Sequence, residues 1–337
     1  MTDIPTQDPF ESRFTEAMDL FFEKGEAESA YEKLREMADE GSKHAQHWMG
    51  SFFAEGRVVG KDLGEAIRWY MKAAEQNLAS SETMLGWIFL TQASHQDIDL
   101  GIYWLNKALD QGEVRAAIML GEAYQTGVGA LEINLSESVR YFTKAVELGD
   151  TGAKQHLAWM YKEGIGVAVD LDKSLTLNME AAVEGNASAA YNAGIAYERG
   201  QGTEPDFEKA RAYYEFAAEC GLALAQHNLA ALLANGSGGD VDFKGAMNWY
   251  LRAAASGSPM SRHNLGLMYQ RGEGVEKNAP IALAFFLTGA LVEDEPSKAM
   301  VNQLTQELSS EEVGLAEVIA ERLIQDWNRN EQPPAIN

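Results

Sequence analysis

The chain has 337 residues, 46% hydrophobic and 23% charged, which is an ordinary composition for a folded protein. Its 27 Lys and Arg against 51 Asp and Glu give a formal net charge of −24. Such a negative field repels phosphate and therefore disfavours duplex nucleic acid and anionic membranes as ligands. The single cysteine, Cys220, excludes an internal disulfide framework, and apolar runs such as residues 84–90 are far too short to span a membrane.

The first forty residues contain no secretory signal and no clear repeat. A basic segment followed by an apolar one is missing at the N-terminus, so we expect a cytoplasmic protein, with export by a signal-less route as an alternative. Residues 1–8 are predicted to be disordered. Residues 9–41 resemble a degenerate helix pair whose second half is highly charged, as suits the solvated cap of a stacked array.

The region 42–293 repeats a small residue at steps of 35 to 37 residues. The seven copies are Gly50, Gly86, Gly121, Ala158, Gly194, Ala230 and Gly266. We number positions in each repeat from this residue, which we call the small position. A large apolar residue usually stands at −1, an aromatic usually at +3, and Ala or Ser at −5, which places all of them on one helical face. The period predicts a stacked array of helix pairs, and we call the helix that carries the small position helix A.

Each helix A is followed by a loop and a second helix, which we call helix B. Glycines that suit a left-handed helix end stand at Gly56, Gly127, Gly164, Gly200, Gly236 and Gly272. The expected N-caps of helix B are Asp62, Asp97, Asn134, Asp170, Asp206, Asp242 and Asn278. Aromatic pairs follow at 69–70, 103–104, 141–142, 213–214, 249–250 and 285–286. Because these pairs recur at a fixed phase, we assign them to the core and not to a binding site.

These motifs resemble the Sel-one-like repeat, a relative of the tetratricopeptide repeat with units of about 36 residues. Residues 226–257 and 263–278 are the clearest copies, and the resemblance covers about residues 42–293. It implies an all-α fold: a right-handed α/α superhelical solenoid of about seven two-helix repeats, used as a scaffold or adaptor and common in bacteria. Three departures stand out. The second loop, 91–97, lacks glycine and is one residue shorter than the usual loop. The third loop, 126–134, is one residue longer than usual, and helix B of the fourth repeat, 175–182, has no aromatic pair.

The C-terminal region resembles a closing helix pair without the repeat spacing. Residues 295–308 and 309–327 are predicted helices, so that 294–328 would cap the array. Ser309 or Ser310, each followed by acidic residues, is expected to start the last helix. Residues 329–337 are expected to be disordered.

Little in the sequence indicates chemistry. Histidines recur at −3 in His47, His227 and His263, but one repeat of separation is too far for a shared metal, and no paired ligand motif accompanies them. The loop glycines follow the repeat and so belong to turns, and Cys220 has no assigned base. We therefore expect no metal, no cofactor and no catalysis, with a hydrolase that uses an unrecognised acidic site as an alternative.

Helix A is expected to line the concave face of the solenoid, so the positions beside its buried stripe, −3, +1, +4 and +5, are candidates for binding. The candidate residues are His47, Trp87, Gln155, Trp159, Lys162, Tyr191, Arg199, His227, His263 and Arg271. Trp87, Trp159 and Tyr191 would form an aromatic patch with cationic ends, unless curvature packs the rings against the next helix A. The predicted function is a non-enzymatic scaffold or adaptor that binds a protein or peptide segment in this groove. A regulatory or effector protein exported to act on a host is the main alternative.

Overall fold

The computed structural model describes residues 9–329, in which the chain forms eighteen α-helices, one 3-10 helix and no β-strand. The chain divides into two compact units, Met1–Ala168 and Val169–Asn337, which we call the N-terminal unit and the C-terminal unit. The expectation of disorder for residues 1–8 and 330–337 lies outside the described residues. Arg329, which we placed in the tail, instead forms the C-cap of the last helix.

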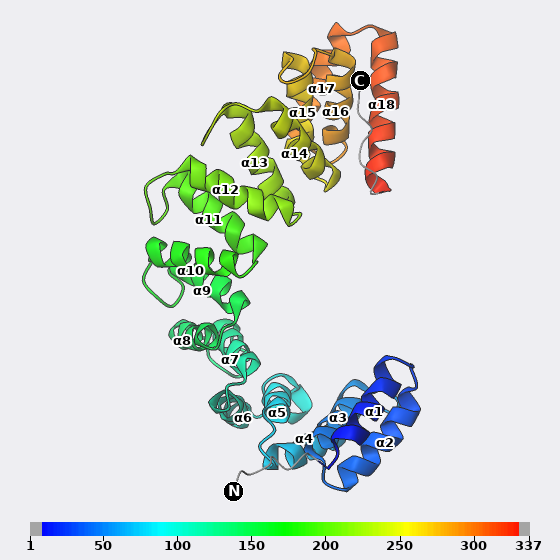
Figure 1. Ribbon diagram of the computed structural model, residues 1–337, viewed down its shortest axis with the longest axis vertical. Helices are drawn as coiled ribbons and strands as arrows, with labels where there is room; N and C mark the ends of the chain where they lie inside the picture. Colours follow the sequence, from blue (N-terminus) through cyan, green and yellow to red (C-terminus); the bar gives the residue numbers. More distant parts are fainter. Residues whose placement is uncertain (1–8, 330–337) are drawn as a thin grey trace, which may run out of the picture. The chain divides into compact units, whose positions relative to one another are not determined.

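Within each unit the helices follow one another as antiparallel pairs (Figure 1). The N-terminal unit contains α1 (Glu11–Phe22), α2 (Ala27–Asp39), α3 (Lys43–Glu55), α4 (Leu63–Glu75), α5 (Ala79–Thr91), η1 (Ala93–His95), α6 (Ile98–Asp110), α7 (Val114–Thr126), α8 (Leu135–Glu147) and α9 (Thr151–Glu163). The C-terminal unit contains α10 (Leu171–Val183), α11 (Ala187–Arg199), α12 (Phe207–Glu219), α13 (Ala223–Asn235), α14 (Phe243–Ala255), α15 (Pro259–Arg271), α16 (Ala279–Ala290), α17 (Glu295–Glu307) and α18 (Ser310–Asn328). From α1 to α9 and from α10 to α17, consecutive helices pack on each other, as in an α/α solenoid.

The predicted helix boundaries are confirmed. The six loop glycines are the C-caps of their helices, with φ between 69° and 76°, a left-handed conformation that a residue with a Cβ atom adopts only under strain. Each of the seven Asp or Asn residues accepts a hydrogen bond from the backbone N–H three residues later, at the start of helix B. The glycine-free second loop forms η1 instead.

The small position lies against the side chain of helix B that is eight residues beyond its N-cap. A Cβ atom added at Gly50 would lie 2.6 Å from the ring of Tyr70, and one added at Gly266 would lie 2.6 Å from the ring of Phe286. Both rings are fully buried. The small residue therefore sets the distance between the two helices of a repeat, as the sequence predicts.

The prediction that Tyr103 and Trp104 of α6 both lie in the core is wrong for Tyr103. Tyr103 is 55% exposed, whereas Trp104 and Leu105 are buried. Counting from the N-cap Asp97 places Leu105 where Tyr70 lies in α4, and a Cβ at Gly86 would indeed meet the side chain of Leu105. The buried pair of this helix is therefore Trp104 and Leu105, because the distance from the N-cap decides which side chain faces helix A.

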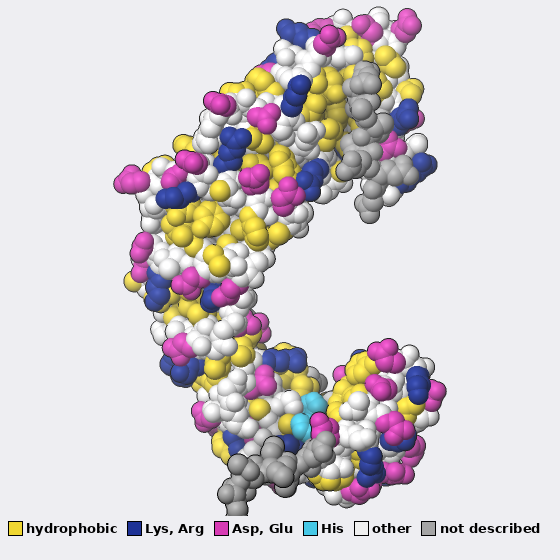
Figure 2. Space-filling model, viewed as in Figure 1, with side chains coloured by type: hydrophobic (Ala, Val, Ile, Leu, Met, Phe, Trp, Pro, Cys, Tyr) yellow, Lys and Arg dark blue, Asp and Glu magenta, His cyan; other side chains and the backbone are white. Residues whose placement is uncertain are grey.

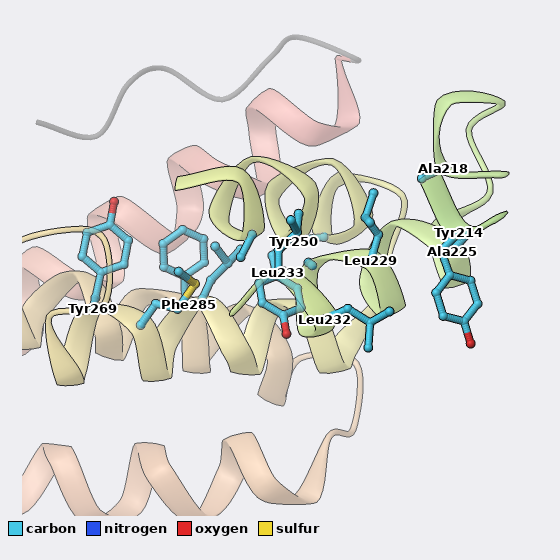
Figure 3. Packing of buried hydrophobic residues seen from close by; sticks show 14 of the residues in the cluster. Tyr214, Ala218, Ala225, Leu229, Leu232, Leu233, Tyr250, Tyr269 and Phe285 are labelled. Carbon is cyan, nitrogen blue, oxygen red and sulfur yellow. The ribbon is translucent and has the colours of Figure 1, made fainter. Parts of the chain in front are cut away.

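The core of the C-terminal unit is continuous along its helices (Figure 3). Leu229, Leu232 and Leu233 of α13 are buried beside Tyr250 of α14. Farther along, the rings of Tyr269 and Phe285 stack at 5.6 Å between centroids. Each repeat thus buries its apolar face against the next, which is how a solenoid is stabilised without one central core.

The C-terminal helices keep more of the repeat than expected. The hydroxyl of Ser297 in α17 lies 3.2 Å from Nδ1 of His263, and the same contact joins His47 to Ser81 between two regular repeats. α17 therefore takes the position of a helix A, although we expected no repeat spacing here. α18 then packs on α16, and its buried Trp327 lies under the guanidinium of Arg262 at 4.7 Å.

Candidate functional site

The histidines at position −3 join neighbouring repeats. Nδ1 of His47 lies 2.9 Å from Oγ of Ser81, and Nδ1 of His227 lies 2.9 Å from Oγ of Ser261. The imidazole of His47 also lies 5.3 Å from the ring of Tyr70 in its own repeat. His47, His227 and His263 are only partly accessible. These three binding candidates therefore also have a structural role, because each contacts the next repeat and packs on its own helix B.

Burial of His47 makes the stability of the fold depend on pH. Loss of water, with a smaller effect from the charge of His44, lowers the pKa of His47 from 6.5 to about 4. The unfolded chain binds a proton at this residue below about pH 6.5, whereas the folded chain does so only near pH 4. Stability from the neutral ring is therefore complete above pH 6.5 and is lost as the pH falls from 6.5 toward 4.

We expect the replacement His47→Gln to reduce this loss. Gln155 occupies the same repeat position in α9, so a glutamine side chain fits there. Between pH 7 and pH 5 the free energy of unfolding of the variant should fall by about 1–2 kcal/mol less than that of the wild type. Urea unfolding of both proteins at the two pH values measures the difference, and equal falls would contradict a neutral buried His47.

Tyr191 and Gln155 occupy the same position in other repeats and are also half-buried. The ring of Tyr191 lies 5.7 Å from that of Tyr214, and burial raises the pKa of its hydroxyl. Tyr191 packs against the core of the C-terminal unit. For this residue, then, the packing alternative describes the structure better than a free aromatic surface.

Position +1 carries two exposed tryptophans. The side chain of Trp87 is 39% exposed and that of Trp159 is 41% exposed. Trp87 is the single exposed residue among residues 81–90 of α5, in which seven residues are buried. The corresponding residue of α7, between these two helices A, is the exposed Glu122. The N-terminal unit therefore presents two tryptophan side chains that are partly exposed to solvent.

The ring of Trp159 has an ordered support. Its centroid lies 5.4 Å from His156 in an edge-on contact, and His156 stacks on Phe142 at 4.1 Å. Nε2 of His156 lies 2.9 Å from Oε1 of Gln125 in α7. A ring held in this way loses little conformational freedom when it binds a partner.

The cationic candidates are exposed but belong to different units. Lys162 lies beside Trp159 in α9 and pairs with Glu163 at 3.3 Å. Arg199 and Arg271 are exposed in the C-terminal unit, where Arg271 pairs with Glu273 at 3.7 Å. Position +1 of that unit holds Ile195, Ala231 and Leu267, which are partly buried against its core. Of the predicted aromatic patch and its cationic ends, the N-terminal unit therefore contains Trp87, Trp159 and Lys162.

Sequence reasoning missed a pocket in the N-terminal unit. It encloses about 190 Å³ and is lined by Phe21, His47, Trp48, Ser51, Phe52, Glu55 and Arg57. Trp48 stands at −2, a position without a repeat pattern, and Phe21 belongs to α1, which has no repeat register. Only His47 was among our candidates, so local aromatic density in residues 10–53 was the one signal that could have indicated this pocket.

Among residues 9–329, no group of three or more His, Cys, Asp or Glu side chains is arranged to hold a metal ion. Across the same residues, no helix is both long enough and apolar enough to cross a bilayer.

The seven repeats match those of a known protein family. The Sel1 repeat model matches residues 43–78, 79–113, 114–150, 153–177, 187–222, 223–258 and 259–291. The short fourth match ends where helix B lacks its aromatic pair. Among solved structures, a Sel1 repeat protein from Oxalobacter formigenes is 27% identical, with a TM-score of 0.64 over 87% of this chain and 86% of that one. The protective antigen c5321 of uropathogenic Escherichia coli shares the fold, with a TM-score of 0.51 and 23% identity over 95% of this chain and 85% of that one.

Two curated relatives are matched over part of their length. HRD3 of Candida glabrata, a component of an ERAD-associated E3 ubiquitin-protein ligase, is 44% identical over 66 residues, which are 19% of this chain and 8% of that protein. The mouse DAP3-binding cell death enhancer 1 is 28% identical over 175 residues, which are 41% of this chain and 34% of that protein. The chain thus spans about a third or less of these relatives. Because the repeat matches cover well over half of its residues, the chain belongs to the Sel1 repeat family.

Proposed function

We propose that this chain is a non-enzymatic scaffold or adaptor that binds a segment of a partner protein on the helix A face of its N-terminal unit. The observation that carries the proposal is the exposure of Trp87 and Trp159 at the same repeat position. Exposed aromatic side chains on a rigid face are the usual anchors of protein interfaces, in which a few such residues supply most of the binding energy.

The family supports the general class of function. Sel1 repeat proteins are generally scaffolds for protein interactions. One relative is named as a component of a ligase assembly and another as a protein that binds DAP3. For this chain we propose a protein partner in the cytoplasm, and the excess of acidic side chains supports a protein over nucleic acid. Acidic and basic side chains are interspersed on the visible surface of both units (Figure 2).

The carboxyl groups with shifted pKa values support a scaffold over a hydrolase. Among the described residues, the carboxyl groups with a clearly shifted pKa are Glu40, Asp206, Glu293 and Glu312. In each case a hydrogen bond at the surface lowers the pKa. The donor is Arg13 for Glu40, Lys209 for Asp206, Lys298 for Glu293 and Ser309 for Glu312. A carboxylic acid that donates a proton in catalysis needs the opposite shift, a raised pKa.

We expect the double replacement of Trp87 and Trp159 by alanine to abolish partner binding without unfolding the chain. Neither side chain belongs to the fully buried core, so the chain should stay folded without them, whereas loss of two interface anchors weakens binding by about 100-fold or more. Affinity capture from native lysate, quantified for each captured protein, compares the variant with the wild type.

The matched control is Tyr103→Ala, which removes an exposed aromatic ring from helix B of the same unit. Proteins lost in the tryptophan variant but retained in the control are the specific partners. Circular dichroism should show that all three proteins keep their helical content, and thermal unfolding should show that all three are folded at the temperature of the capture. Full retention of every captured protein by the tryptophan variant would refute this binding face.

A further inference from the structure

The pocket beside α1 lies between the end of that helix, α3 and the turn after α3. Phe21 comes from α1, and Trp48, Ser51 and Phe52 come from α3. A volume of about 190 Å³ is below the roughly 300–1,000 Å³ of sites for drug-sized molecules. The space therefore suits one side chain of a partner and not a complete cofactor.

The walls of this pocket are aromatic. The centroid of Phe21 lies 5.6 Å from that of Trp48 and 5.7 Å from that of Phe52, and both pairs are edge-on. Phe22, which is 65% exposed, extends the cluster at 5.9 Å from Trp48. The face of a Trp or Phe ring is electronegative and attracts a flat cation, so these side chains are suitable partners for a guanidinium group.

The polar lining of the pocket contains one carboxylate, Glu55, and two uncharged groups, Ser51 and His47, besides Arg57. Oγ of Ser51 lies 3.1 Å from the hydroxyl oxygen of Tyr70, and the ring of His47 is neutral at physiological pH. The carboxylate of Glu55 lines the pocket and is about half exposed. It is near enough to the Tyr70 hydroxyl to contribute to the raised pKa of that group.

Arg57 also lines the pocket, and its Nε lies 2.5 Å from Oε2 of Glu55. Both side chains of this ion pair are more than half exposed. Exposed pairs contribute only about 0–1 kcal/mol, so an incoming cation that also contacts the rings can replace Arg57 at the carboxylate. The negative charge of the whole chain, −24, adds long-range attraction for a basic segment.

We propose that this pocket binds an arginine side chain of the partner segment, with its guanidinium against the rings of Phe21 and Trp48 and paired with Glu55. The inference rests on the proposed function, since it assigns the chemistry of one contact of the partner. It adds that the partner is basic where it reaches the first repeat, which neither the repeat pattern nor the exposed tryptophans indicate.

The test uses short probes and does not require the partner. The indole N–H signals of the seven tryptophans of the full chain are recorded by NMR, and Trp48→Phe identifies the signal of Trp48. The probe is the tripeptide acetyl-Gly-Arg-Gly-amide, with glutamate and norleucine in place of arginine as comparisons. We expect the arginine peptide to shift the Trp48 signal in a saturable way at millimolar concentration, and the other two to shift it far less.

Glu55→Gln should weaken binding of the arginine peptide by about five- to tenfold. Glu163→Gln is the matched control, because Glu163 occupies the same +5 position in α9 and is similarly exposed, and it should leave binding unchanged. Equal binding of norleucine, preference for glutamate, absence of a Trp48 shift, or an unaltered affinity in Glu55→Gln would each overturn the proposal. These outcomes are independent of Trp87 and Trp159, so the pocket can fail while the proposed binding face stands.

Discussion

Replacing Lys107 by methionine is expected to lower the free energy of unfolding by about 3 kcal/mol. The side chain of Glu82 is completely buried, and its Oε1 lies 2.8 Å from Nζ of Lys107. Methionine keeps much of the packing of the lysine stem but leaves this carboxylate without its cation. Removing one partner of a buried ion pair is costly because the other charge stays buried and uncompensated. Urea unfolding of the full chain measures the change.

The other repeats suggest a specific rescue. Glu82 stands at −4, where Gln46 donates a hydrogen bond of 3.1 Å to the carbonyl of Ala38, and Gln226 donates one of 3.2 Å to that of Ala218. Glu82 has no amide N–H to donate to the corresponding carbonyl, that of Ala74. Nζ of Lys107 donates to this carbonyl instead, at 3.4 Å. Adding Glu82→Gln to the Lys107→Met protein should therefore restore most of the lost stability. A double variant no more stable than Lys107→Met would show that the buried charge is not the cause.

Replacing Gly266 by alanine is expected to destabilise the C-terminal unit by about 1–3 kcal/mol. The new Cβ would lie 2.6 Å from the ring of Phe286, which is fully buried and cannot move aside. The helices α15 and α16 would have to separate, and overpacking of a tight core costs about this much. In a helix without such a contact, the same substitution adds about 1 kcal/mol of stability, because alanine is the better helix former.

Gly314→Ala is the matched control in the same unit. Gly314 lies inside α18, and a Cβ atom there would have no neighbour within 4 Å. We expect this variant to be more stable than the wild type by about 0.5–1 kcal/mol, opposite in sign to Gly266→Ala. Thermal unfolding of the three proteins distinguishes the two effects, and a stabilised Gly266→Ala protein would refute the role assigned to the small position.

The helices and their ends were predictable because the signals that set them are local. A glycine such as Gly200 ends a helix through its own backbone conformation, and Asp206 begins the next through a bond three residues away. Seven copies of one pattern then remove the ambiguity that any single copy would leave. The buried pair of α6 was predicted one residue too early, because the prediction used the positions of the aromatic residues and not the distance from the N-cap Asp97.

The binding face was less predictable because a helix A in a solenoid has more neighbours than a surface helix. Periodicity locates one buried stripe, but helix A touches its own helix B, the preceding repeat and the next one. Position −3 is therefore drawn into the contact between repeats, as the bond from His47 to Ser81 shows. Position +1 is exposed at Trp87 and partly buried at Leu267, a difference that depends on the local packing of each repeat.

Site-specific photo-crosslinking tests whether the exposed tryptophans of helix A contact a partner protein. Benzoylphenylalanine is placed at Trp87, at Trp159 and, as a control on helix B, at Tyr103, and mass spectrometry identifies the joined peptides after irradiation in native lysate. We expect positions 87 and 159 to crosslink to the same partner protein and position 103 not to do so. Crosslinking of that partner from position 103 alone, or no crosslink from positions 87 and 159, would contradict it.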